Sequence, residues 1–251
     1  MTPASRALLA ACVLASVLLR PVPLMAAEDV DQDGLADAWE EVFQTDPRRA
    51  DTDGDGFFDG EEIRQGFDPR QSGGARLKET DADEDGLTDR FEFLFKTNPR
   101  AQDSDGDGYG DGQEITKGYD PLAMQGKTLA KRLLVDLSEQ KLFQELGGVI
   151  IATHVVSSGK ASTPTPVGTY SILNKHRRAW SGSAKLWMPY WMAFRADGYG
   201  FHELPEWPGG KKEGKAHLGT PVSHGCVRIG EGVAKMLYDW TPVGTKVVIQ
   251  R

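Results

Sequence analysis

The sequence predicts a mainly β domain that follows a small domain of loop–helix repeats, and three observations support this. The first half of the chain repeats one short acidic pattern four times. The second half alternates β-branched and aromatic runs with turn residues. Residues 28–121 carry 28 acidic and 10 basic residues, whereas residues 122–251 carry 9 acidic and 17 basic residues. This asymmetry indicates two modules with different roles, after an N-terminal segment of residues 1–27.

Residues 1–27 have the composition of an export signal. Arg6 precedes an apolar run over residues 7–19, and residues 24–27 offer a cleavage site with small side chains. We therefore expect the segment to be removed and the protein to reach the periplasm or cell envelope. No later segment is long and apolar enough to span a bilayer. An uncleaved helix that anchors the chain is the alternative.

Four acidic loops begin at Asp29, Asp51, Asp81 and Asp103. Each has Asp at loop positions 1, 3, 5 and 9, Gly at position 6 and Glu at position 12, the spacing of a twelve-residue calcium loop. Carboxylates crowded in one loop repel each other, so we expect Ca²⁺ to be a structural cofactor. The predicted ligands are Asp29, Asp31, Asp33, Asp37, Glu40, Asp51, Asp53, Asp55, Asp59, Glu62, Asp81, Asp83, Asp85, Asp89, Glu92, Asp103, Asp105, Asp107, Asp111 and Glu114.

The loops are too close together for full helix–loop–helix units. They start 22 residues apart within a pair, and the pairs repeat at an offset of 52 residues. Only a short helix fits after each loop, with apolar residues such as Trp39 and Phe43 on one face and a turn with proline at its end. The pattern resembles the bacterial thrombospondin type 3 repeat, a calcium-binding module, over residues 28–121. A merely solvated acidic segment is the alternative.

The second module is predicted from strand patterns. Runs at 133–137 and 149–156 are rich in β-branched residues. Further strands are predicted at 168–170, 191–194 and 246–249. One helix is expected over 232–239. A β domain of this size can bury one core, so we expect residues 122–251 to fold without the repeats, which would then act as a spacer.

Cys226 is the only cysteine outside the predicted signal, where Cys12 lies. Cysteines of exported proteins usually pair, so a single thiol is either inert or kept for its reactivity. His224 and Gly225 precede it directly. They favour reactivity, because a thiolate nucleophile needs a base and an unobstructed approach for the reacting carbonyl.

The whole module resembles the L,D-transpeptidase, or YkuD-like, catalytic domain. The segments that carry the resemblance are 135–143, 157–170, 188–190, 200–202, 218–229 and 242–249. The resemblance implies a β-sandwich or mixed-sheet fold in which Cys226 is the nucleophile and His202 the general base. It further implies that His224 and Gly225 shape the turn and present backbone N–H groups to an oxyanion.

The resemblance also implies substrate contacts by Ser223, Arg228 and Tyr190, with a structural salt bridge as the other role open to Arg228. An insert at 207–214 makes the spacer after His202 longer than is common in the family, and His217 is the rival base.

The activity that the resemblance implies is acyl transfer on peptidoglycan stem peptides through a thioester, without a cofactor for catalysis. The acceptor is the amine of a second stem or of an envelope protein. Two alternatives remain: an L,D-carboxypeptidase with the same site, and a calcium-dependent cell-wall-binding scaffold with an inactive enzyme domain. Lys and Arg form no dense run, so nucleic acid is not an expected partner.

Overall fold

The computed structural model describes residues 28–124 and 126–251, so the predicted signal lies outside the described residues. One compact unit ends at Lys78 and the other spans Glu79–Arg251. This boundary differs from the one expected after residue 121, because it divides the repeats between the units. Within the described residues, no helix is long and apolar enough to cross a membrane.

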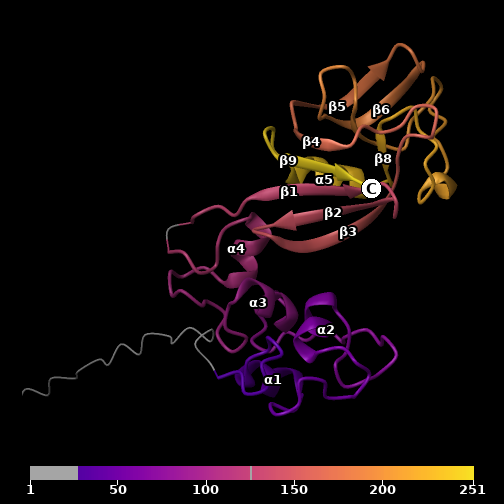
Figure 1. The fold of residues 1–251 in the computed structure, drawn as a ribbon. Coiled ribbons are helices and arrows are strands. Elements are labelled where there is room, and N and C mark those ends of the chain that lie inside the picture. Colours follow the sequence, from indigo (N-terminus) through magenta and orange to yellow (C-terminus); the bar gives the residue numbers. More distant parts are fainter. Residues whose placement is uncertain (1–27, 125) are drawn as a thin grey trace, which may run out of the picture. The chain divides into compact units, whose positions relative to one another are not determined.

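Each acidic loop leads into a helix of seven residues, as expected. The helices are α1 (Asp37–Phe43), α2 (Asp59–Gln65), α3 (Asp89–Phe95) and α4 (Asp111–Lys117) (Figure 1). All four begin at the position-9 aspartate, whose negative charge is favourable at a helix N-terminus. All four end at a residue with left-handed backbone, glycine in α2 and α4.

A close backbone approach joins the two loops of each pair. In the first unit, the Gly60 N–H donates to Asp33 Oδ2 at 2.9 Å, and in the second unit the Gly112 N–H donates to Asp85 Oδ2 at 2.7 Å. A Cβ atom at Gly112 would lie only 2.7 Å from the Asp85 carbonyl oxygen. The second residue of α2 and of α4 is therefore glycine because no side chain fits there.

The β domain is one mixed sheet with the strand order β4-β9-β1-β2-β3-β8-β7-β6-β5. The pairs β1–β9 and β7–β8 are parallel and the other pairs are antiparallel. The predicted mainly β, mixed-sheet fold is confirmed. The elements are β1 (Lys131–Asp136), β2 (Lys141–Leu146), β3 (Val149–Ser157), β4 (Gly168–Ser171), β5 (Asn174–Ser181), β6 (Leu186–Ala193), β7 (Gly200–Glu203), a 3-10 helix (Lys215–His217), β8 (Val227–Ile229), α5 (Val233–Trp240) and β9 (Lys246–Gln250).

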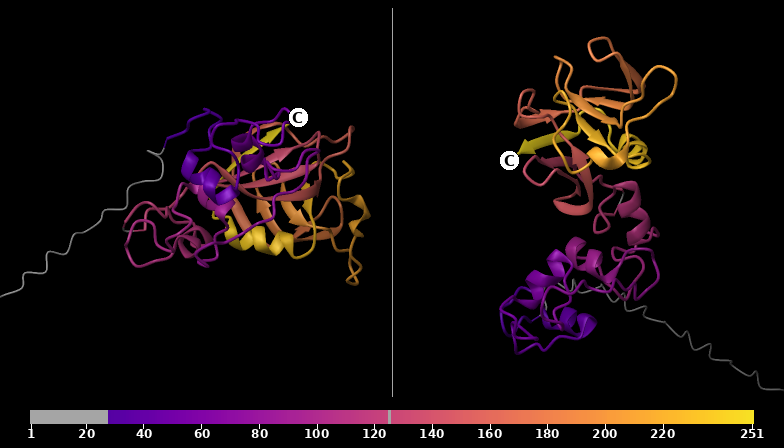
Figure 2. Two further views of the ribbon diagram at one scale, coloured as in Figure 1. Left: turned by 90° about the horizontal axis from the view of Figure 1, so that it is seen from below. Right: turned by 90° about the vertical axis from the view of Figure 1, so that its right-hand side faces the viewer.

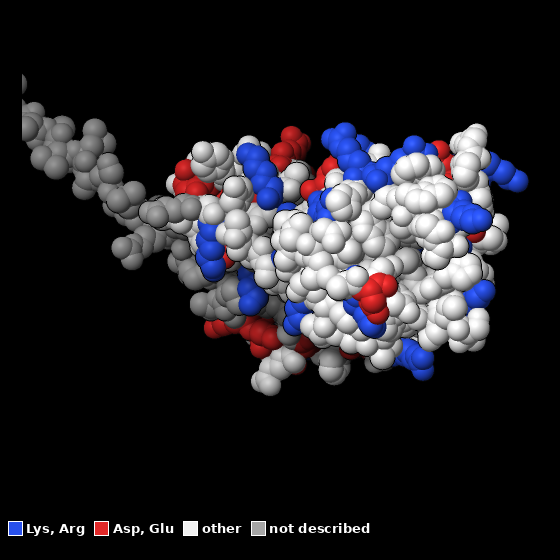
Figure 3. Space-filling model, turned by 90° about the horizontal axis from the view of Figure 1, so that it is seen from above, with Lys and Arg blue, Asp and Glu red and all other residues white. Residues whose placement is uncertain are grey.

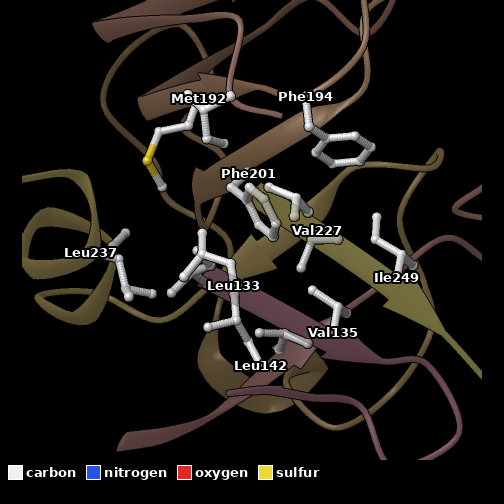
Figure 4. Packing of buried hydrophobic residues seen from close by; sticks show 14 residues of the cluster. Leu133, Val135, Leu142, Met192, Phe194, Phe201, Val227, Leu237 and Ile249 are labelled. Atoms are coloured by element: carbon white, nitrogen blue, oxygen red, sulfur yellow. The ribbon is translucent and has the colours of Figure 1, made fainter. Parts of the chain in front are cut away.

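One core lies between the two halves of this sheet. Leu133, Leu142 and Ile249 from the β9-β1-β2 half pack with Phe201 and Val227 from β7 and β8 (Figure 4). The helix α5 covers β6 and β7 (Figure 2). Apolar burial of this kind is the main stabilising contribution, at about 25 cal/mol per Å².

A second core joins the later repeat pair to the β domain. Leu87, Phe95 and Ile115 of the repeats cluster with the buried Leu146 of β2, and Trp240 at the end of α5 packs against them. Residues 79–121 thus share buried surface with the sheet, which explains the boundary at Lys78. The expectation that residues 122–251 fold as an independent unit does not agree with this packing.

Candidate active site

The parallel pair β7–β8 brings the predicted catalytic residues together. Phe201 pairs with Val227 and His202 pairs with Arg228 in the strand register. Phe201 and Val227 face the core, and successive side chains alternate, so His202 and Arg228 face the other side of the sheet. Cys226 precedes Arg228 by two residues and shares that side. These three side chains line one cavity of about 550 Å³.

Hydrogen bonds within residues 223–226 fix the turn that presents the thiol. The Ser223 hydroxyl donates to the Cys226 carbonyl at 2.6 Å and accepts from the Gly225 N–H at 3.0 Å. Gly225 has φ of 118°, and a Cβ atom there would lie 2.4 Å from the Tyr199 ring. Only glycine fits this position.

Two predicted roles in this turn do not match its geometry. The Ser223 hydroxyl is buried and engaged in the turn, so it builds the loop and is not free for a substrate. The Gly225 N–H is committed to Ser223, so it is not free for an oxyanion. His224 is exposed and lines the cavity.

His202 is buried and its ring is oriented by a backbone carbonyl. Its Nδ1 lies 2.5 Å from the carbonyl oxygen of Glu203. A carbonyl only accepts, so Nδ1 carries the proton and Nε2 is the basic nitrogen. Burial lowers the pKa of His202 to about 4, and the nearby charge of Arg228 acts in the same direction. The imidazole is therefore neutral at pH 7 and can accept a proton.

The thiol of Cys226 is protonated in the resting site. Burial raises the pKa of Cys226, while the Gly200 N–H and the charge of Arg228 act to lower it. The thiol donates to the Gly198 carbonyl oxygen at 3.6 Å. A neutral thiol and a neutral imidazole that line one cavity suit base-assisted attack, in which the proton moves as the sulfur reacts.

Glu213 connects two residues of the cavity wall, Arg228 and His217, and nothing in the sequence except its charge pointed to it. Nη1 of Arg228 lies 3.0 and 2.9 Å from the two oxygens of Glu213. Nδ1 of His217 lies 3.0 Å from Glu213 Oε1. Arg228 is thus engaged in a salt bridge through Nη1, while its buried Nε has no hydrogen-bond partner among the described residues. His217, the rival base, is half-exposed and paired with a carboxylate.

Tyr190 does not line the Cys226 cavity. It packs against Tyr238 of α5, with ring centroids 5.8 Å apart, in a separate hollow that Arg177 and Lys235 also line. The predicted substrate contact by Tyr190 therefore differs from its place in the structure. The opposite wall of the Cys226 cavity comes from the β5–β6 hairpin, through Ser181 and Leu186, and from Trp207 of the insert.

The acidic loops gather their carboxylates as the pattern predicts. Ligand atoms at positions 1, 3 and 5 lie within 4.8 Å of one another in each of the four loops. One carboxylate oxygen at position 3 and one at position 12 are buried without a hydrogen-bond partner in every loop. These residues are Asp31, Glu40, Asp53, Glu62, Asp83, Glu92, Asp105 and Glu114. Buried carboxylate oxygens without a donor are the environment that a hard cation satisfies.

The position-9 aspartates are used differently from the prediction. The Thr52 N–H and hydroxyl donate to the two oxygens of Asp59, at 2.8 and 2.6 Å. Ser104 does the same to Asp111, at 3.0 and 2.5 Å. These carboxylates tie the loop to the helix start instead of facing the cluster.

Without a cation, the position-12 carboxyls are hard to ionise. Burial raises the pKa of Glu40, Glu62 and Glu114 to about 7 and that of Glu92 to about 8, and the neighbouring aspartates add to the effect. The donor set therefore fits a divalent cation, which would reverse this repulsion.

Two family models match this chain. Residues 130–249 match the model of the L,D-transpeptidase catalytic domain, YkuD, and residues 51–69 and 103–123 match that of the bacterial TSP3 repeat. The chain therefore carries an L,D-transpeptidase catalytic domain preceded by bacterial TSP3 repeats, which confirms the resemblance stated from its motifs.

Individual relatives are similar over about half of this chain. A putative L,D-transpeptidase, YciB of Bacillus subtilis, is 35% identical over 123 residues, which cover 46% of this chain and 63% of YciB. The putative L,D-transpeptidase YkuD of Bacillus subtilis is 27% identical over 124 residues, which cover 49% of this chain and 68% of YkuD. This chain thus spans less than two thirds of YciB.

Solved L,D-transpeptidases are among the structures to which this chain is similar. The structure from Stackebrandtia nassauensis has 30% identity and a TM-score of 0.41, with 55% of this chain and 63% of that chain covered. The structure from Mycobacterium smegmatis has 21% identity and a TM-score of 0.44, with 50% and 61% covered.

Proposed function

We propose that this protein is a cysteine-dependent L,D-transpeptidase that acts on peptidoglycan stem peptides through a thioester acyl-enzyme. One observation carries the proposal: Cys226 and His202 line the same cavity, and the Glu203 carbonyl orients the His202 ring. The family match and the names of the relatives support the reaction class.

In the first half-reaction, His202 Nε2 takes the thiol proton as the sulfur of Cys226 attacks the carbonyl that follows an L-centre. The C–N bond then breaks, and the protonated imidazole returns the proton to the leaving D-amino acid. A thioester on Cys226 remains. In the second half-reaction, His202 takes a proton from the acceptor amine, which attacks the thioester and releases the thiol.

The acceptor is the amine of a second stem peptide, or of an envelope protein. If water is the acceptor instead, the same site acts as an L,D-carboxypeptidase. The ratio of cross-linked to hydrolysed product from a stem tetrapeptide separates these outcomes. A cross-linked or exchanged product that disappears in Cys226→Ser supports the proposal. If only hydrolysed product forms, the protein is an L,D-carboxypeptidase. If the wild-type protein forms no product, the remaining candidate is a cell-wall-binding scaffold.

The four acidic loops are proposed to bind Ca²⁺ as a structural cofactor. Carboxylates at positions 1, 3, 5 and 12 would hold the ion, and the unpartnered oxygens at positions 3 and 12 support this. Calcium would stabilise the folded state by mass action. Titration of the whole protein should release or absorb heat and raise the melting temperature, and no change in either would contradict the calcium sites.

The proposed substrate lies outside the cytoplasm, which supports a location in the periplasm or cell envelope. The signal-like composition of residues 1–27 supports that location. Lys and Arg are scattered over the face of the molecule in Figure 3 and do not gather in one patch. The protein's proposed partner is peptidoglycan, with no role for nucleic acid.

A further inference from the structure

The insert between His202 and the Cys226 turn is a short, fixed hairpin. Glu206 and Trp187 of β6 exchange backbone hydrogen bonds of 3.0 and 2.8 Å. The Trp207 N–H donates to the Lys211 carbonyl at 2.8 Å, and the Glu213 N–H donates to the Pro205 carbonyl at 2.9 Å. Because its backbone is paired at both ends, the insert can hold its side chains at fixed places.

Two consecutive residues of this hairpin contact the two catalytic strands. Lys212 Nζ lies 2.9 Å from Glu203 Oε1 on β7, and Glu213 Oε2 lies 2.9 Å from Arg228 Nη1 on β8. The side chains of Glu213 and Arg228 are both 9% exposed, so this ion pair is shielded from water. In the other pair Glu203 is 5% exposed and Lys212 is 40% exposed, so only the carboxylate is buried. Removing one partner of such a pair leaves a buried charge, which is costly.

Both contacted residues are directly linked to the catalytic pair. Glu203 follows His202, and its backbone carbonyl holds Nδ1 of the His202 ring. Arg228 is the strand partner of His202 and lies two residues after Cys226. We propose that Lys212 and Glu213 are positioning residues: they clamp Glu203 and Arg228, and so fix the His202 ring and the Cys226 turn relative to each other.

This proposal rests on the proposed function, and it also predicts an electrostatic effect of Glu213 alone. The groups that surround the thiol are His202, Arg228, His224, and the Glu213–His217 pair. The positive charge of Arg228 favours the thiolate, and Glu213 neutralises that charge. Lys212 forms ion pairs with Glu203 and Glu231. Neither glutamate lines the cavity that contains the thiol, so Lys212 should not affect the pKa of Cys226 in the same way.

The test measures acyl-enzyme formation from a stem tetrapeptide and, separately, alkylation of Cys226 by iodoacetamide at pH 7. Glu213→Gln should slow acyl-enzyme formation by about tenfold or more, because misplaced reacting groups lose rate steeply. The same variant should alkylate about threefold to tenfold faster, since one unit of thiol pKa is a tenfold change in thiolate. Lys212→Met should slow acyl-enzyme formation similarly, with alkylation unchanged within about twofold.

Matched variants make these outcomes decisive. Lys211→Met is the control, because Lys211 is exposed in the same hairpin and forms no ion pair among those of the described residues. It should behave as wild type in both assays. Lys212→Arg should restore most of the acylation rate. Glu213→Gln combined with Arg228→Gln should cancel the faster alkylation while acylation stays slow.

Wild-type acylation rates, within about twofold, in both Glu213→Gln and Lys212→Met would overturn the clamp. So would a Glu213→Gln protein that alkylates as wild type does while its melting temperature and acylation fall together, because that is only a general loss of structure. If Glu213→Gln does not fold, Lys212→Met and its Lys212→Arg rescue still decide. Alkylation needs no stem peptide, so a wild-type protein that alkylates without forming an acyl-enzyme would contradict the proposed function, not the clamp.

Discussion

At the scale of single residues, the cavity is lined by a thiol and an imidazole whose neutral forms are both favoured by burial. Burial acts on both in opposite directions. It raises the pKa of Cys226, because the thiolate loses solvation, and it lowers the pKa of His202 to about 4, because the imidazolium loses solvation. A preformed thiolate–imidazolium pair would require both shifts to be reversed, so the proton transfer belongs to the reaction step.

The first prediction concerns the pH dependence of the free thiol. Because the pKa of Cys226 is raised, the thiolate fraction is small at pH 7 and grows as pH increases. The rate of alkylation by iodoacetamide should therefore rise about tenfold per pH unit from pH 6 to beyond pH 8.5, the usual thiol pKa. Stopped-time mass measurement of the alkylated protein follows this rate. A plateau that begins below pH 6 would show a stable ion pair and contradict the neutral resting site.

The second prediction concerns which histidine is the base. His202→Gln should reduce acyl-enzyme formation by about a hundredfold or more, the usual contribution of a general base. His217→Gln should reduce it by less than about tenfold, because His217 is half-exposed and only supports Glu213. The two variants are matched controls for each other. The assignment is wrong if His217→Gln has the larger effect.

At the scale of elements, the repeats are held together by backbone contact between a loop and a helix. The helix α4 approaches the third loop so closely that Gly112 has no room for a side chain. The α3 and α4 helices also present Phe95 and Ile115 to the sheet. An acidic loop, a short helix and an apolar contact with β2 therefore form one continuous piece of structure.

The third prediction follows from this close approach. Gly112→Ala should lower the free energy of unfolding by about 2 kcal/mol or more, because the added Cβ would overlap the Asp85 carbonyl oxygen or push α4 away from the loop. Gly182→Ala is the control, since nothing lies within 4 Å of a Cβ atom there. Denaturant unfolding in calcium compares the two. Equal stability would mean that α4 and the loop do not pack this closely.

At the scale of the molecule, the sequence pattern changes at residue 121 but the packing does not. The later repeat pair shares an apolar cluster with Leu146 and Trp240, so it belongs with the sheet, whereas the first pair belongs to the unit that ends at Lys78. The repeats are thus not a uniform spacer. One pair contributes to the fold of the catalytic unit itself.

The fourth prediction compares two truncated chains. Residues 79–251 should unfold in one cooperative transition that calcium moves to higher temperature. Residues 122–251 should melt lower and aggregate more readily, because Leu146 and Trp240 lose the cover of Phe95 and Ile115. Calorimetry with and without chelator makes the comparison. Equal melting temperatures for the two chains would restore the independent domain expected from the sequence.

The sequence predicted those features that depend on local spacing. The four loops and their short helices follow from fixed intervals, and the family resemblance named Cys226 and His202, which line one cavity. It could not reveal that Lys212 and Glu213 reach across to Glu203 and Arg228, because that contact depends on how the insert pairs with β6. It also predicted a different position for Tyr190. A motif predicts the strand on which a residue lies, but it does not predict which hollow the side chain enters.

The most direct test of covalent catalysis by Cys226 is the intact mass of the protein during reaction with a stem tetrapeptide. Covalent catalysis by Cys226 predicts an adduct that equals the tetrapeptide minus its terminal D-amino acid, located on Cys226 by peptide mapping. The adduct should form slowly in His202→Gln and be absent in Cys226→Ala. Product formed without any adduct, or an adduct that persists in Cys226→Ala, would contradict covalent catalysis by this thiol.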